Sequence, residues 1–121
     1  MEGLCKMPEK IMKIGYIFEF DAAHKLPHLE NKCKNLHGHT YKVELQIKGE
    51  CINGMVMDFH DLKRDIQFII DRLDHTYLND IIQIPTAENI CEYIYQNVCF
   101  RDKLSLLRVW ESSTTYAEIP L

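Results

Sequence analysis

Two long stretches of alternating side chains constrain the fold of this 121-residue chain more than any other feature. In residues 14–24, every second side chain, counted from Ile14, is apolar until the series ends at His24. The side chains between them are mostly not apolar, and Ile17 is the residue that departs from this pattern. In residues 37–48, every second side chain, counted from His37, is mostly apolar, whereas the side chains between them are mostly charged or polar. Side chains two residues apart lie on the same face of a β-strand, so both stretches are predicted to be half-buried strands. The irregular segment KLPHLENKCKN between them can connect antiparallel neighbours.

Helical periodicity follows these two strands. Asp58 is placed to cap a helix over residues 59–73, in which apolar side chains recur at helical spacing. A second helix is predicted to begin at Pro85 and Thr86, and the last segments, LSLLRVWES and TTYAEI, are predicted to form a β-hairpin. The order of two strands, two helices and two strands predicts an α+β domain, in which an antiparallel four-stranded sheet carries both helices on one face.

Three histidines lie at the ends of the two predicted strands: His24 ends the first strand, and His37 and His39 lie at the start of the second. In the segment HGH, His37 and His39 are two residues apart, so a strand points both rings to the same side. His24 shares its parity with the apolar face of the first strand, and the three imidazoles converge if the two strands pair with like faces together. Three histidines without a fourth protein ligand are typical of catalytic zinc sites, which keep a position open for water or substrate. The alternative for each histidine is a hydrogen-bonded core residue.

Cys33 lies four residues before His37 in a polar segment flanked by lysines. It could be a fourth metal ligand, a nucleophile or base, or a small buried residue. Neighbouring positive charge lowers the pKa of a thiol and favours the reactive thiolate.

Composition excludes several classes of protein. The net charge of -4 and the pI near 5.8 argue against a general nucleic-acid binder, which carries a clustered basic surface. No segment approaches the roughly 20 apolar residues of a membrane-spanning helix, and no signal peptide is evident. The five cysteines are odd in number and lack C-x-x-C spacing, so we expect reduced thiols and a cytoplasmic protein. Without repeats or linker-like tracts, a single domain is expected over residues 1–121, with a core at about 14–120.

Six motifs resemble one known family. FDAAHKL, CKNLHGH, GMVMDF, LDHTYLN, PTAEN and a late WES occur in the order found in the 6-pyruvoyl-tetrahydropterin synthase family. The three residues between Cys33 and His37 resemble the 6-carboxytetrahydropterin synthase branch of queuosine biosynthesis, whereas pyruvoyl-forming members have a longer gap. A branch that cleaves dihydroneopterin derivatives by retro-aldol chemistry has glutamate in place of this cysteine. Asp21 and Ser112 stand where many members carry serine and threonine, and neither is expected to carry chemistry.

The resemblance implies a T-fold and a set of site residues. It implies zinc ligands at His24, His37 and His39, a catalytic thiol at Cys33, a proton-transfer pair at Asp74 and His75, a pterin anchor and relay acid at Glu111, and a further pterin contact at Thr86.

The implied reaction converts 7,8-dihydroneopterin triphosphate to 6-carboxy-5,6,7,8-tetrahydropterin with release of acetaldehyde and triphosphate. A homo-oligomer is also implied, with a hexamer of two trimeric rings expected. Lys25 and Lys42 are candidate triphosphate contacts. The rival hypotheses are a pyruvoyl-type synthase, which eliminates triphosphate without cutting the side chain, and a non-catalytic zinc- or pterin-binding module. A structural zinc domain is disfavoured because a fourth ligand is missing.

Overall fold

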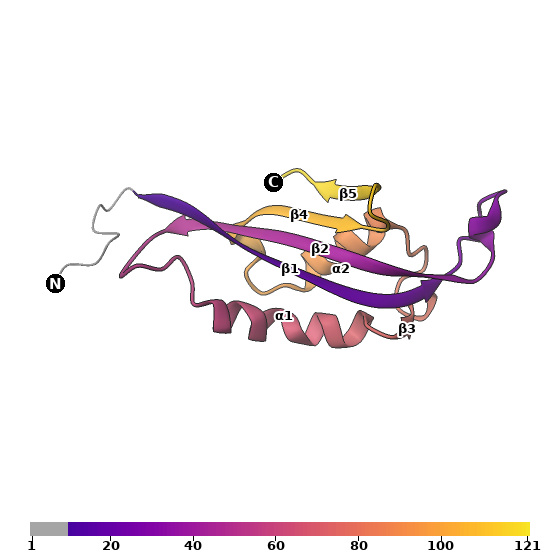
Figure 1. Cartoon of the computed structure of the whole chain (residues 1–121), viewed down its shortest axis with the longest axis horizontal. Helices are drawn as coiled ribbons and strands as arrows, with labels where there is room; N and C mark the ends of the chain where they lie inside the picture. Colours follow the sequence, from indigo (N-terminus) through magenta and orange to yellow (C-terminus); the bar gives the residue numbers. More distant parts are fainter. Residues whose placement is uncertain (1–9) are drawn as a thin grey trace.

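A computed structural model describes residues 10–121 of the chain, and its frame is a pair of long antiparallel strands. Strand β1 (Ile11–His24) pairs with strand β2 (His37–Glu50) along its whole length. The two strands run side by side across the molecule in Figure 1. Both predicted strands are therefore confirmed.

The sheet has five strands, in the order β3-β1-β2-β4-β5. Strands β4 (Leu104–Trp110) and β5 (Tyr116–Ile119) form the predicted closing hairpin. The expectation of four antiparallel strands is wrong by one short strand, because β3 (Thr76–Tyr77) pairs in parallel with β1. Two residues are too few to show an alternating pattern, so this strand exists only because the chain leaving the first helix passes beside β1.

Two helices cover one face of this sheet. Helix α1 (Phe59–Leu73) begins at Asp58, whose carboxylate accepts a hydrogen bond from the His60 amide at 2.8 Å. Helix α2 (Ala87–Asn97) begins at Thr86, whose hydroxyl accepts from the Asn89 amide at 3.2 Å. The predicted cap at Asp58 and the predicted start of the second helix are confirmed. Figure 1 shows α1 running beneath the long strands.

Side chains from the sheet and both helices form one core. Its fully buried members are Tyr41, Val43, Leu45 and Ile47 on β2, Leu62, Ile66, Ile69 and Leu73 on α1, Leu78 after β3, Ile90 and Ile94 on α2, and Leu107 and Val109 on β4. The inward parity of β1 adds Phe18 and Phe20. Apolar burial therefore holds the inner face of both long strands against the helices.

Short 3-10 helices occupy three connections: η1 (Lys32–Lys34) between β1 and β2, η2 (Leu78–Asp80) after β3, and η3 (Arg101–Lys103) before β4. None of the helices in residues 10–121 is long and apolar enough to cross a membrane.

The cysteines depart from the sequence expectation at one position. Cys33, Cys91 and Cys99 are free thiols, as expected. Cys51, which is buried just after β2, is disulfide-bonded, so the expectation of reduced thiols is wrong there. An odd number of cysteines does not exclude a single bond, and spacing along the chain does not reveal which thiols the fold brings together.

Candidate metal centre

Three imidazole rings meet where β1 ends and β2 begins. The strand register sets His24 opposite His37 and Ala22 opposite His39, so all three rings lie on the inner face. Their centroids are 4.6, 4.8 and 5.1 Å apart, and one ligand nitrogen from each ring lies within 4.8 Å of the others. The convergence of the three imidazole rings, which the alternation of the two strands predicts, is therefore confirmed.

Backbone carbonyls orient two of these rings. His24, which is fully buried, places Nδ1 2.7 Å from the Pro85 carbonyl oxygen, and His37 places Nδ1 2.7 Å from the Asn35 carbonyl oxygen. A carbonyl only accepts, so each Nδ1 carries the hydrogen and each Nε2 keeps its lone pair. The two Nε2 atoms lie 3.0 Å apart. Two nitrogens bound tetrahedrally to zinc, each at about 2.0–2.1 Å, lie about 3.3–3.4 Å apart, so this spacing is close to that of a shared metal ion.

The third ring supplies an unpartnered nitrogen. His39 Nε2 is buried and has no hydrogen-bond partner among residues 10–121. The nearest acid is Glu111, whose Oε1 is 3.9 Å away. Burial lowers the pKa of His39 more than the Glu111 charge raises it, so the ring is held neutral. A buried donor or acceptor without a partner is costly, and a neutral imidazole nitrogen is a metal ligand. The three histidines therefore fit a bound metal ion.

A small cavity adjoins this cluster on the side of Glu111. Its volume is about 220 Å³, and it is lined by Leu26, Thr86, Ala87, Glu88, Glu111, Thr115 and Tyr116. Thr86 and Glu111, both singled out from the sequence, thus lie on one cavity although 25 positions separate them in the chain. Glu88 is a second acid on its wall.

Asp74 and His75 form a separate group. The Asp74 carboxylate lies 2.9 Å from His75 Nδ1 and accepts a hydrogen bond from the Asp21 amide at 2.9 Å. The His75 amide donates to the Asp21 carbonyl at 2.6 Å, and His75 has a positive φ of 58°. The His75 side chain is 78% exposed, and Asp21 has the opposite parity to His24 on β1. A single chain therefore brings this pair together but does not group it with the three histidines.

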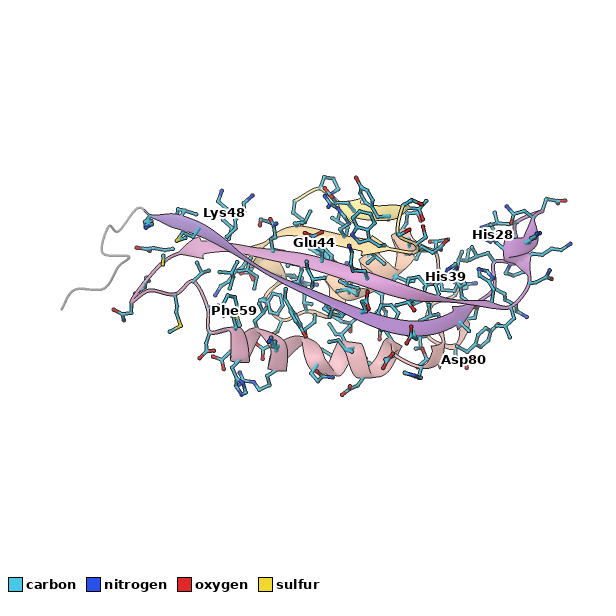
Figure 2. All side chains as sticks on the ribbon, in the orientation of Figure 1. His28, His39, Glu44, Lys48, Phe59 and Asp80 are labelled. Atoms are coloured by element: carbon cyan, nitrogen blue, oxygen red, sulfur yellow. The ribbon has the colours of Figure 1, made fainter. Side chains whose placement is uncertain are left out.

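Cys33 lies in the connection between β1 and β2. This connection projects past the end of the sheet, as the position of His28 relative to His39 shows in Figure 2. Cys33 is half-buried, and its carbonyl accepts a hydrogen bond from the Leu26 amide at 2.8 Å, which ties the connection to the end of β1. Its sulfur is not part of the group that could hold a metal with the three histidines. Among the three possibilities for Cys33, a fourth ligand is the one that this geometry disfavours.

The two candidate lysines do not lie together. The Lys42 ammonium lies 4.4 Å from the centre of the Trp110 ring, on the face of the sheet opposite to His39 and Tyr41. Lys25 follows His24 directly, and its backbone exchanges two hydrogen bonds with the Asn79 side chain. Of the two candidate lysines, Lys25 is therefore the one that lies at the end of β1.

Comparison with known proteins fits this geometry. Residues 13–120 match 6-pyruvoyl tetrahydropterin synthase as a family. The chain belongs to this family. The family resemblance and the T-fold expected from the motifs are thereby confirmed, and the family places the chain among the enzymes of pterin metabolism.

Three relatives illustrate the range of the match. A protein of Archaeoglobus fulgidus, provisionally named a 6-carboxy-5,6,7,8-tetrahydropterin synthase, is 44% identical over 92% of this chain and 97% of its own length. The dihydroneopterin monophosphate aldolase of Pyrococcus furiosus is 39% identical over 88% of this chain and 96% of its own. The 6-pyruvoyl tetrahydropterin synthase of Caenorhabditis elegans has the same fold, with a TM-score of 0.84 at 24% identity, over 95% of this chain and 99% of that chain.

The Asp74 carboxylate makes a testable contribution to stability. The hydrogen bond from the Asp21 amide, followed by that from His75, lowers the pKa of Asp74. A lowered folded-state pKa means that the carboxylate stabilises the fold above its unfolded-state pKa of about 3.9 and that this contribution is lost as pH falls through the folded-state value. We expect Asp74→Asn to be less stable than the parent protein at pH 7, with the difference shrinking below about pH 4.

Urea unfolding at pH 7 and at pH 3.5 measures this difference. Asp80→Asn, at an exposed carboxylate nearby, is the control and should change little at either pH. An Asp74→Asn deficit of the same size at both pH values would contradict the assignment.

Proposed function

We propose that this chain is a zinc-dependent lyase of the cytoplasm. It converts 7,8-dihydroneopterin triphosphate and one water molecule to 6-carboxy-5,6,7,8-tetrahydropterin, with release of acetaldehyde and triphosphate, on the route to queuosine or another deazapurine. The observation that carries the proposal is the triad of His24, His37 and His39, because His39 lies 3.9 Å from Glu111, which lines a cavity together with Thr86. A closed structural site would need a fourth ligand, whereas an open one suits a substrate.

The cavity is suited to the flat, donor-rich edge of a pterin. The Glu111 carboxylate can accept two parallel N–H bonds from such an edge, and a charged acceptor makes these bonds strong. Thr86 lies at the start of α2, where the helix dipole is positive and partial negative charge on the ring is favoured. Anchoring at Glu111 directs the side chain of the pterin toward the histidines, since His39 is 3.9 Å from Glu111.

Proton transfer is assigned to residues of this chain. When bound at the triad, zinc supplies Lewis acidity that stabilises negative charge on a side-chain oxygen of the substrate. Cys33, as thiolate, removes carbon-bound protons. His75, oriented by Asp74 at 2.9 Å, exchanges protons with oxygen.

The separation of the two groups favours assembly. His75 is exposed and Asp74 is half-buried, and neither joins the triad of its own chain. We therefore propose a homo-oligomer, with a hexamer of two trimeric rings expected, in which the partner subunit's Asp74 and His75 complete each site. The edges of the sheet, one of them β5, offer the unpaired backbone through which copies could associate.

Retro-aldol cleavage is a second candidate, favoured by the 39% identity to the aldolase of Pyrococcus furiosus. Cys33 argues against it, because the related branch that performs retro-aldol cleavage carries glutamate at this position. The pyruvoyl-type synthase and the non-catalytic binding module also remain as rivals.

The products distinguish these candidates, and Cys33→Ala tests the mechanism. With dihydroneopterin triphosphate, the parent protein should release acetaldehyde and a carboxylated pterin. A pyruvoyl product, a phosphorylated glycolaldehyde, or zinc binding without turnover would support the synthase, the aldolase and the binding module respectively. Cys33→Ala should retain one zinc per chain and lose about 10²–10⁴-fold in kcat, the range for a general acid–base step. Loss of zinc from this variant would make Cys33 a ligand instead.

Shared sites can be tested by mixing two inactive variants. His39→Ala lacks the triad and His75→Ala lacks the relay, so each should be inactive as a homo-oligomer. When the two are unfolded and refolded together, about a quarter of the sites should combine an intact triad with an intact relay, and activity should return to about that fraction. A mixture no more active than its components would show that each chain completes its own site.

A further inference from the structure

Tyr41 has a fixed position beside the triad. It follows His39 by two residues on β2, so it shares the inner face with the ligand histidines, and its ring lies 5.5 Å from that of His39. The side chain is fully buried, and its ring stacks on that of Phe20, the residue opposite on β1, with centroids 5.0 Å apart and planes 12° apart. This packing leaves the ring no freedom to move its hydroxyl.

The hydroxyl is directed at one histidine. Tyr41 Oη lies 3.2 Å from His24 Nδ1 and 3.4 Å from His24 Nε2. Within residues 10–121, these are the hydrogen bonds found for this hydroxyl. A buried hydroxyl without a partner destabilises a fold, and phenylalanine would fill the same space without that penalty. Packing against Phe20 therefore accounts for an aromatic ring at this position, and the contact with His24 accounts for the hydroxyl group.

The bonding roles follow from the other contacts of His24. Nδ1 carries a hydrogen that it donates to the Pro85 carbonyl at 2.7 Å, with Tyr41 Oη as a second, more distant acceptor. Nε2 keeps its lone pair for the metal ion, so the bond that the Tyr41 hydroxyl retains in a metal-loaded site is the one that it accepts from Nδ1–H. The Pro85 carbonyl and the Tyr41 hydroxyl thus both hold the Nδ1 side of the His24 ring and leave Nε2 to the metal.

We propose that Tyr41 is a positioning residue of the metal site, whose hydroxyl holds the His24 ring so that its Nε2 faces the nitrogens of His37 and His39. This proposal rests on the proposed function of the triad as a zinc site. Groups that orient a ligand histidine typically alter metal affinity by about 10–100-fold when they are removed.

Tyr41→Phe tests this role because it removes one oxygen atom and keeps the stacked ring. Zinc affinity is measured on metal-free protein by competition with a chromophoric chelator. We expect affinity to fall about 10–100-fold, with the melting temperature of the metal-free protein unchanged or slightly raised. Tyr16→Phe is the matched control: Tyr16 lies on the inner face of β1 and packs on Phe18, so its variant should bind zinc as the parent protein does.

A spectroscopic measurement separates positioning from packing. Cobalt(II) bound in place of zinc has visible absorption bands that depend on ligand geometry, and these bands should shift in Tyr41→Phe and stay unchanged in Tyr16→Phe. Parent affinity and spectrum in Tyr41→Phe, or a loss of affinity matched by an equal loss of stability of the metal-free fold, would overturn the proposal. Failure of the parent protein itself to bind zinc would instead overturn the proposed function on which it rests.

Discussion

The register of β1 against β2 governs both the core and the candidate metal centre. Successive side chains of a strand alternate in direction, so a slip of one residue would turn the inward set of either strand to solvent. Each buried Val, Leu or Ile contributes about 1.5–3 kcal/mol, against a typical total stability of about 5–15 kcal/mol for a domain. Exposing Val43, Leu45 and Ile47 would therefore cost a large part of the stability. Apolar burial fixes the register, and the register sets His24 opposite His37.

The candidate metal centre is built from the second helix as well as from the sheet. The Pro85 carbonyl, just before the capping residue of α2, holds Nδ1 of His24, and the end of β4 brings Glu111 within 3.9 Å of His39. The site is thus a junction of four elements, each held by the common core. By contrast, Asp74 is anchored on the backbone of β1. A single chain presents two separate groups of candidate site residues, and this division is the physical reason for proposing a shared site.

Local periodicity accounts for what the sequence predicts correctly. The alternation of side chains predicts both long strands and the shared face of the three histidines. Residues suited to helix N-termini predict where both helices start. The features that escape prediction depend on contacts between distant segments. Strand β3 is too short to have a period, and the disulfide bond of Cys51 joins positions that spacing does not relate. In the sequence, Tyr41 is simply the next member of an apolar series. The role of its hydroxyl cannot be predicted, because it depends on His24, which only the fold brings beside it. The Asp74 and His75 pair follows from family resemblance, but its separation from the triad is visible only in the fold.

X-ray absorption spectroscopy of the zinc-loaded protein tests the central claim most directly, because it reports the atoms that surround the metal. An open site made by His24, His37 and His39 predicts imidazole nitrogens at about 2.0–2.1 Å, one further oxygen, and no sulfur. The Cys33→Ala protein should then give the same spectrum. A sulfur shell at about 2.3 Å, or fewer than three histidine ligands, would contradict the account.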